Sequence, residues 1–390
     1  MKALLLILVL LPWTCLAGEI PLGMTTALTG PAGKLGQAMR LGIETCFKAV
    51  NDAGGIHGAR IRLHVLDDGY EPVRAARNMR ALIDRYKVRA FIGNVGTPTA
   101  ILTAPIANET HTLMFGALSG ARILRDKQYR PYVINYRASY AEETAAMIRH
   151  LLDNGIAPRE IAFFTQRDSY GDDGYQGALA ALRAHGFNDA DQLTHARYTR
   201  NSLNVEGAVA DILDAPVTPR AIIMVASYAP AAKFIRLLRQ DLPGIQFLNV
   251  SFVGAKSLVD ALGDAAEGVI VTQVVPPYAS DLRIARRFRA DLARFRPDAE
   301  PGYVSFEGYI VACLFAEGLR RAGPDPTSDD IIRALESIHG LDMGLGIPIS
   351  FGPDKHQALH RVWPSRYQGG RFIGVEWLDH HGAKTGGRSR

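Results

Sequence analysis

The chain has 390 residues, of which 47% are hydrophobic and 21% are charged, a mixture typical of globular proteins and not of disordered, collagenous or coiled-coil chains. At about 150 residues per domain, this length predicts two or three domains. Lysine and arginine number 44 against 39 aspartate and glutamate residues, and no long run has one sign, so nothing indicates a nucleic-acid-binding arm. Three cysteines are too few for a disulfide scaffold.

The first eighteen residues carry the features of an export signal. Lys2 supplies a positive charge, residues 3–11 are uninterrupted apolar residues, and Ala17 is the small residue that signal peptidase prefers. The pattern predicts a cleaved signal peptide at 1–18. The apolar run is about half of the roughly 20 residues that span a membrane, which favours a signal peptide over a spanning helix. The alternatives are an N-terminal membrane anchor and a lipid-modified Cys15. We therefore expect an exported protein.

Export places Cys46 and Cys313 in an oxidising compartment, where they could form a disulfide. Both cysteines lie in predicted helices, and 313 − 46 = 267 positions separate them. Because a bridge requires a short and correctly oriented approach that sequence does not establish, we expect two buried single thiols.

Short apolar runs alternate with amphipathic helical segments along the first part of the chain. Glycines end two of these helices, at Gly54 and at Gly155, because glycine adopts the left-handed cap conformation at least cost. The predicted strands are 20–24, 61–67, 90–93, 113–116 and 133–136. The predicted helices are 36–51, 72–86, 97–109 and 141–154.

The alternation begins again at Glu160 and ends in a helix-rich stretch. Strands that are separated by single helices need right-handed crossovers and therefore form a mostly parallel sheet. Two such runs predict an α/β fold with two doubly wound parallel-sheet lobes. The predicted strands are 161–165, 221–226, 247–250 and 269–275. The predicted helices are 171–185, 202–214, 230–240, 281–295, 303–321 and 328–338.

The loops after the strands are the candidate binding segments, because parallel sheets of this kind bind ligands beyond the carboxyl ends of their strands. These loops contain hydroxyl groups, aromatic rings, glycines and helix N-termini, which suit a small polar or anionic group. In chain order the loops are 25–36, 94–99, 117–120, 166–171, 227–228 and 251–254.

No catalytic or cofactor motif in the sequence is complete. Lys34 is followed by Leu35 instead of Ser or Thr, which excludes a phosphate loop, and Ser119 lacks the spacing of a nucleophile elbow. No dinucleotide fingerprint follows a strand, and no spacing suits a zinc site. The sequence therefore predicts neither an enzyme nor a cofactor or metal.

Three other pairs of polar residues have ordinary structural interpretations. Asp67 and Asp68 are expected to cap the helix that starts near Pro72 instead of forming an acid/base pair. His356 and His360 are four residues apart, but Gly352 and Pro353 just upstream make a helix there unfavourable. The pair at 380–381 lies in a polar, glycine-rich tail, 380–390, which we expect to be disordered and solvated.

Five short motifs occur in an order and spacing that resemble a known family. The sequence is similar to type I periplasmic solute-binding proteins of ABC importers, in the branched-chain amino acid (Leu/Ile/Val)-binding family, from about residue 20 to about residue 377. The motifs are Leu28-Thr29-Gly30-Pro31 with Gly36, Asn51-Asp52-Ala53-Gly54-Gly55-Ile56-His57-Gly58, Asp67-Asp68, Tyr170-Gly171 and Gly263-Asp264-Ala265-Ala266-Glu267-Gly268-Val269.

The resemblance implies a Venus-flytrap architecture, in which two lobes joined by three crossing strands close on a ligand by hinge bending. Lobe one would comprise residues 19–137 plus 277–346, and lobe two residues 138–276 plus 347–379. The crossings would lie near 138–139, 274–277 and 349–352.

The resemblance also implies binding residues, with departures from the family pattern. Thr97 matches a serine whose hydroxyl contacts the ligand carboxylate, whereas Ser251 stands where the family has the glutamate that holds the ammonium group. Gly120 replaces a frequent threonine, and Leu35 replaces a frequent aromatic residue. The candidate ligand-binding residues are Leu35, Thr97, Pro98, Leu118, Ser119, Gly120, Tyr140, Tyr170, Tyr228, Ser251 and Phe252.

Structural roles are the alternative for several of these side chains. Thr97 could serve only as a helix N-cap. Tyr170 and Tyr228 could simply pack the starts of their helices, and Phe252 could belong to the core.

The departure at Ser251 changes the expected ligand. Burying an ammonium without a charged partner costs several kcal/mol, and a hydroxyl does not replace a carboxylate. We therefore expect an anionic or uncharged organic molecule with an apolar part, and Asp168 is the nearest residue that could restore an ammonium site. The alternatives are a true branched-chain or other amino acid ligand, and a sensor that reports to a membrane receptor or kinase.

The expected protein is periplasmic and monomeric, and it delivers a small-molecule ligand to the permease subunits of an ABC importer in the inner membrane. We expect it to have no nucleic-acid partner.

Overall fold

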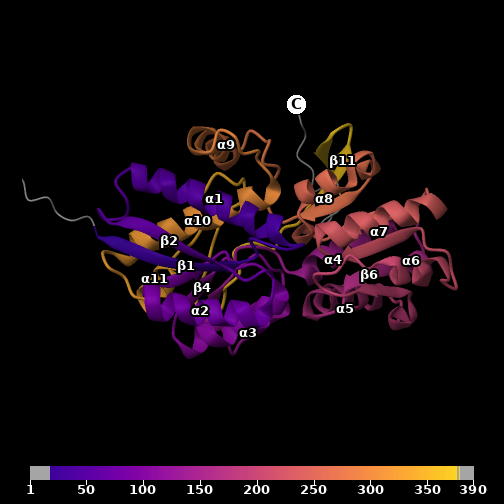
Figure 1. The fold of residues 1–390 in the computed structure, drawn as a ribbon, viewed down its shortest axis with the longest axis horizontal. Coiled ribbons are helices and arrows are strands. Elements are labelled where there is room, and N and C mark those ends of the chain that lie inside the picture. The colour runs from indigo at the N-terminus through magenta and orange to yellow at the C-terminus, as the bar shows by residue number, and fades with distance from the viewer. Residues whose placement is uncertain (1–17, 376, 378–390) are drawn as a thin grey trace, which may run out of the picture.

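The computed structural model describes residues 18–375 and residue 377 and shows two α/β lobes side by side (Figure 1). Almost all of the predicted signal peptide, and the whole predicted tail with its histidine pair, lie outside the described residues. None of the helices in the described ranges is long and apolar enough to span a membrane.

The first lobe is built on a five-stranded sheet in the order β2-β1-β3-β4-β5, in which all neighbours are parallel. Strand residues alternate between its two faces: Ile92 packs with α1 and α10, and Phe91 packs with α2 and α3. The strands are β1 (Glu19–Thr26), β2 (Arg60–Asp67), β3 (Ala90–Ile92), β4 (Leu113–Phe115) and β5 (Val133–Ile134). The helices are α1 (Gly33–Asp52), α2 (Pro72–Tyr86), α3 (Thr97–Glu109), α9 (Arg283–Phe295), α10 (Tyr303–Ala322) and α11 (Ser328–Glu336).

The second lobe is built on a seven-stranded sheet in the order β12-β11-β10-β9-β8-β6-β7. The five strands from β10 to β7 are parallel, and β11 and β12 form an antiparallel hairpin on β10. The strands are β6 (Ile161–Gln166), β7 (His195–Tyr198), β8 (Ala221–Val225), β9 (Gln246–Asn249), β10 (Ile270–Gln273), β11 (Trp363–Gln368) and β12 (Arg371–Gly374). The helices are α4 (Tyr140–Asp153), α5 (Ser169–Ala184), α6 (Glu206–Leu213), α7 (Tyr228–Asp241) and α8 (Ala255–Leu262).

The chain passes between the lobes three times: after β5, after β10 and before β11. The first and third passages run side by side, because the Asn135 N–H donates to the His356 carbonyl (2.7 Å) and the Leu359 N–H donates to the Tyr136 carbonyl (3.0 Å). The third passage was expected near 349–352, but Ile349 pairs with Leu341, near the end of α11. The two-lobed α/β fold is confirmed, and the exact lobe boundaries stay predictions.

All of the predicted helices and strands are present, but three pieces of the second lobe were not predicted. These are β7, α8 and the β11–β12 hairpin. β7 and β12 are only four residues long and include arginine, and β11 contains Pro364, so none of them forms an apolar run typical of a strand. The two histidines at 356 and 360 are not helical, as expected.

The prediction of two single thiols is wrong, because Cys46 and Cys313 form a disulfide. Cys46 lies on α1 and Cys313 on α10, and these two helices pack closely: a Cβ on Gly42 or on Gly308 would overlap backbone atoms of the other helix. Their Cα atoms are 5.8 Å apart, within the range that a disulfide spans. The separation along the sequence concealed this contact between facing helices.

The prediction that Asp67 and Asp68 cap α2 is also wrong. The N-cap residue of α2 is Glu71, and its side chain makes no cap hydrogen bond. Asp67 instead accepts from the Leu28 N–H (2.8 Å) and the Thr29 hydroxyl (2.7 Å). Burial alone would raise the pKa of Asp67, but these hydrogen bonds lower it to about 2. The aspartates therefore tie the loop after β1 to the loop after β2.

Candidate functional site

Loops from both lobes meet where the carboxyl ends of the two sheets face each other (Figure 1). The ring of Tyr70, from the loop after β2, lies 5.9 Å from the ring of Phe252 in the second lobe. The side-chain amide of Gln166 donates to the Tyr70 hydroxyl at 3.4 Å. Each of these three residues is at most 1% exposed, so the lobes enclose this interface. We call this interface the cleft.

Three buried hydroxyl groups form a cluster in the cleft. The Thr97 and Ser119 hydroxyl oxygens are 2.7 Å apart, and the Tyr140 hydroxyl lies 3.5 Å from each of them. Thr97 is the first residue of α3, and the N-cap position belongs to Gly96, so the Thr97 hydroxyl does not cap its own helix. Lobe one contributes two of the hydroxyls, and Tyr140 on α4 contributes the third.

Two glycines allow the chain to approach these groups closely. Gly96 has a φ of 108°, and a Cβ there would overlap the Tyr70 ring. A Cβ on Gly120 would lie 2.6 Å from the backbone nitrogen of Tyr140. Leu118 joins the two loops, because its carbonyl accepts from the Gly96 N–H at 3.2 Å. Pro98 is buried in the first turn of α3.

An aromatic wall continues from the hydroxyl cluster into lobe two. The ring of Tyr170 lies 5.2 Å from the ring of Tyr140 and 4.7 Å from the ring of Phe252. The Tyr170 hydroxyl donates to the Ala226 carbonyl at 3.2 Å. Burial raises the pKa of Tyr140, Tyr170 and Tyr70, so these phenols stay neutral. The wall therefore offers apolar rings with neutral polar edges.

The remaining predicted residues lie at the edge of the cleft or behind it. Leu35 contacts lobe two, since a Cβ on Gly254 would overlap its side chain. Tyr228, the first residue of α7, is 8% exposed, and its hydroxyl faces the backbone of Lys34 in lobe one. Ser251 lies in the 3₁₀ turn that follows β9, and its hydroxyl is already hydrogen-bonded to other side chains.

Ser251 belongs to a buried ionic network. Its N–H (2.7 Å) and its hydroxyl (2.9 Å) donate to Glu143, and its hydroxyl oxygen accepts from the Arg137 guanidinium. Arg137 Nη2 lies 3.3 Å from Glu143, and Arg137 Nη1 lies 3.5 Å from Glu307. Arg137 is on the first passage between the lobes, Glu143 is on α4, and Glu307 is on α10. The network therefore joins both lobes at the hinge.

Burial and the attraction between opposite charges together set the protonation states of this network. Burial alone would lower the pKa of Arg137, but Glu307 and Glu143 raise it above its usual value, so the guanidinium stays charged. Burial raises the pKa of Glu143 and brings that of Glu307 to about 7. Glu143 also accepts from the Thr272 hydroxyl at 2.5 Å, whereas Glu307 Oε1 has no hydrogen-bond partner among the described residues.

Asp168, the alternative ammonium partner, is likewise occupied. Its carboxylate caps α5 by accepting from the Tyr170 N–H (3.1 Å), and it accepts from the Gln166 side chain at 2.8 Å. Arg200 lies 3.4 Å from Asp168 and 2.9 Å from Glu71 of lobe one. Glu143, which is hydrogen-bonded to Ser251, and Asp168 thus each already face an arginine.

Sequence reasoning missed four side chains of this region: Tyr70, Arg137, Glu143 and Glu307. Tyr70 follows a strand end as the predicted loops do, so the same rule applied to β2 finds it. Glu307 is a single acid in an otherwise apolar stretch of a buried helix, which is a recognisable signal. Nothing in the sequence separates the buried Glu143 from Glu142, which is partly exposed.

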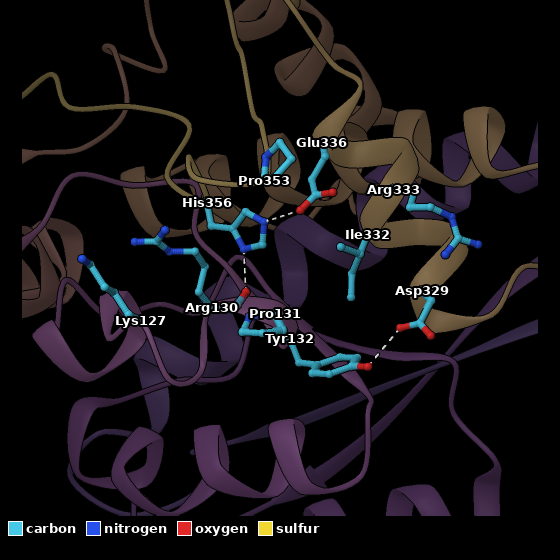
Figure 2. A pocket seen from close by; sticks show the side chains of 10 residues that line it. All are labelled: Lys127, Arg130, Pro131, Tyr132, Asp329, Ile332, Arg333, Glu336, Pro353 and His356. Carbon is cyan, nitrogen blue, oxygen red and sulfur yellow. Dashed lines mark hydrogen bonds and ion pairs between the residues drawn. The ribbon is translucent and has the colours of Figure 1, made fainter.

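A surface pocket of about 360 Å³ lies elsewhere on lobe one, beside α11 (Figure 2). His356 Nε2 lies 2.9 Å from Glu336 there, and the Tyr132 hydroxyl donates to Asp329 at 3.1 Å. None of the predicted ligand-binding residues lines this pocket. Among the residues that the structure describes, no group of three or more His, Cys, Asp or Glu side chains could hold a metal ion.

Comparisons with known proteins place this geometry in a family. The family model described as periplasmic binding protein matches residues 19–371. The Leu/Ile/Val-binding protein BraC3 of Rhizobium johnstonii is 20% identical over 368 residues, which cover 92% of this chain and 94% of that protein.

Solved structures agree with the family model. The crystal structure of a "possible leucine/isoleucine/valine-binding protein" from Rhodopirellula baltica has a TM-score of 0.90 and 45% identity, over 93% of this chain and 97% of that chain. A branched-chain amino acid ABC transporter from Thermus thermophilus with bound valine has a TM-score of 0.81 at 19% identity, over 93% and 96%, and shares the fold. The chain therefore belongs to the periplasmic binding protein family, whose members bind solutes and are not enzymes, and it is similar to members that are named for binding leucine, isoleucine and valine.

Proposed function

We propose that this protein is the binding component of an ABC importer and captures in its cleft a small organic solute that has an apolar part and no ammonium group. The observation that supports this ligand class is the hydrogen bond that the Arg137 guanidinium donates to the Ser251 hydroxyl. An ammonium group at this position would lie against a fixed cation and would have to be buried without a free carboxylate, which costs several kcal/mol.

The other groups of the cleft suit such a ligand. The hydroxyls of Thr97 and Ser119 can donate to a carboxylate or a carbonyl oxygen. The rings of Tyr140, Tyr170 and Phe252 supply a surface for an apolar part. A ligand that contacts both the hydroxyl cluster and the aromatic wall favours the closed arrangement of the lobes. The closed form is the one that an importer would recognise.

A branched-chain amino acid is the second candidate, because relatives carry the name Leu/Ile/Val-binding protein and one solved neighbour holds valine. Its ammonium group would need Asp168, which faces Arg200. The two candidates therefore differ in one group, the amine, on a common apolar skeleton.

A matched ligand panel separates them. Thermal shift and calorimetry on the mature protein would compare leucine, 4-methylpentanoate (the same skeleton without the amine) and 4-methylpentanamide, together with phenylacetate. A ligand at 100 times its Kd adds about 2.7 kcal/mol to the free energy of unfolding. We expect stabilisation by a compound without the amine. Stabilisation by leucine alone would contradict the proposed ligand class.

Site variants then test the cleft. Thr97→Ala and Tyr170→Ala should abolish the shift, whereas Thr218→Ala, at an exposed threonine, should keep it. Uptake of the labelled ligand by cells that lack the gene tests the importer role: unchanged uptake would favour a sensor.

A further inference from the structure

One arginine in the cleft has hydrogen-bond donors with no partner. Arg137 is fully buried, and its Nη2 is used by Ser251 and Glu143. Its Nε and Nη1 have no hydrogen-bond partner among the described residues. Nη1 faces Glu307 Oε1 at 3.5 Å, which is an ion pair but longer than a good hydrogen bond, and Nε has no acceptor among the same residues. A buried N–H without an acceptor is costly, and more so on a charged group, so both donors could take a better-placed acceptor.

The guanidinium lies next to two of the predicted binding residues, Tyr140 and Ser251. Its central carbon is 6.0 Å from the centroid of the Tyr140 ring, and the Tyr140 hydroxyl lies 3.5 Å from both Thr97 and Ser119. The guanidinium therefore lies near the Tyr140 ring, which contacts both the hydroxyl cluster and the Tyr170 ring.

We propose that Arg137 anchors a carboxylate of the ligand through its Nε and Nη1 N–H groups, with Glu307 as the counter-ion that the ligand replaces. This inference rests on the proposed capture of a solute in the cleft and narrows the ligand class from anionic or uncharged molecules to monocarboxylates. Arginine suits this task because its donors match a carboxylate and its charge persists when buried.

The charge balance of the network supports the exchange. In the absence of ligand, Arg137 faces two buried carboxylates, Glu143 on α4 and Glu307 on α10, and Tyr136 and Tyr140 beside it are neutral. Glu143 accepts hydrogen bonds from Ser251 and Thr272, whereas Glu307 Oε1 accepts none among the described residues and has only its ion pair with Arg137. A bound carboxylate and a protonated Glu307 leave the total charge of the network unchanged. Because burial already brings the pKa of Glu307 to about 7, this protonation is accessible near neutral pH.

The test measures carboxylate affinity in variants of the network by calorimetry, with branched, linear and aromatic monocarboxylates such as 4-methylpentanoate and phenylacetate as probes. Arg137→Met combined with Glu307→Gln removes one cation and one anion together. Glu143 loses its arginine but keeps the donors of Ser251 and Thr272. We expect its affinity for the best carboxylate to fall about 10- to 150-fold, the range of a charged hydrogen bond. Circular dichroism and thermal melting would verify that it is folded.

The matched control is Glu307→Gln alone, which mimics the protonated form. It should bind the carboxylate at least as tightly as wild type and should lose the pH dependence, whereas wild-type affinity should fall as pH rises from about 6 to about 8. Calorimetry in buffers of different ionisation enthalpy should show proton uptake by wild type and none by this variant.

The outcomes are distinguishable. Equal carboxylate affinity in wild type and in the folded double variant would overturn the role of Arg137 while leaving the proposed function intact. Leucine binding in preference to every carboxylate would overturn both. Binding of the amide in preference to the carboxylate, or of no carboxylate at all, would overturn the inference.

Discussion

Two arginines connect the lobes, one at the hinge and one at the edge of the cleft, and they differ in burial. Arg137 is fully buried between Glu143 of lobe two and Glu307 of lobe one. Arg200, with a quarter of its side chain exposed, lies between Asp168 of lobe two and Glu71 of lobe one. A buried ion pair is strongly destabilised when one partner is lost, whereas an exposed pair contributes little to folding. The hinge arginine should therefore govern stability and ligand choice, and the edge arginine should govern closure.

The largest expected effect comes from the hinge network. Glu143→Ala leaves Arg137 with one carboxylate and removes the acceptor of the Ser251 N–H and the Thr272 hydroxyl. We expect a loss of about 3–5 kcal/mol in the free energy of unfolding, the cost of breaking a buried pair. Urea denaturation measures it. Glu206→Ala, in an exposed ion pair with Lys233, is the control and should leave the midpoint close to wild type. A small effect of Glu143→Ala would mean that water reaches the network.

Glu307 should make stability depend on pH. Its folded pKa of about 7 lies above the usual value of 4.5, so the folded state holds a proton that the unfolded state has released. Stability should therefore fall as pH rises from about 4.5 to about 7, by about 3 kcal/mol in total. Asp68, whose pKa burial raises to about 6, contributes a decline in the same direction between its usual pKa and that value.

Glu307→Gln isolates this contribution. Thermal melting of the ligand-free variant between about pH 5 and about pH 8 should show a smaller decline than wild type. Glu317→Gln, on the same helix but in contact with Arg321, should keep the wild-type slope. Parallel curves for wild type and Glu307→Gln would contradict the raised pKa.

The difference between the two arginines also explains what sequence could predict. The helices, most strands and the two-lobed fold follow from apolar periodicity and from glycine caps, which are local signals. Thr97, Ser119, Tyr140, Tyr170, Ser251 and Phe252 lie together because each follows a strand or starts a helix at the same end of its sheet, and their ligand contacts stay predictions. Partners far apart in sequence, such as Cys46 with Cys313 or Arg137 with Glu307, depend on which helix faces which, and no local pattern encodes that.

The smallest effect on folding is expected at the edge of the cleft. Arg200→Ala removes the 2.9 Å contact with Glu71, which joins the lobes in the closed arrangement. Because the pair is partly exposed, the free energy of unfolding should change by less than about 1 kcal/mol. The contact with Asp168 lies within lobe two, so only the loss of the Glu71 contact falls on the closed form alone. Ligand affinity should therefore drop a few-fold through faster dissociation, and the drop should shrink at high salt, where wild type is itself weakened. Stopped-flow measurement of ligand release, with the best compound of the panel, gives the dissociation rate at low salt and at high salt. Arg220→Ala is the matched control, because its ion pair with Glu160 (3.2 Å) lies within lobe two and does not depend on closure. Equal release rates for the two variants would show that the edge contact does not favour closure, and selection for the closed form would then rest on the buried groups of the cleft alone.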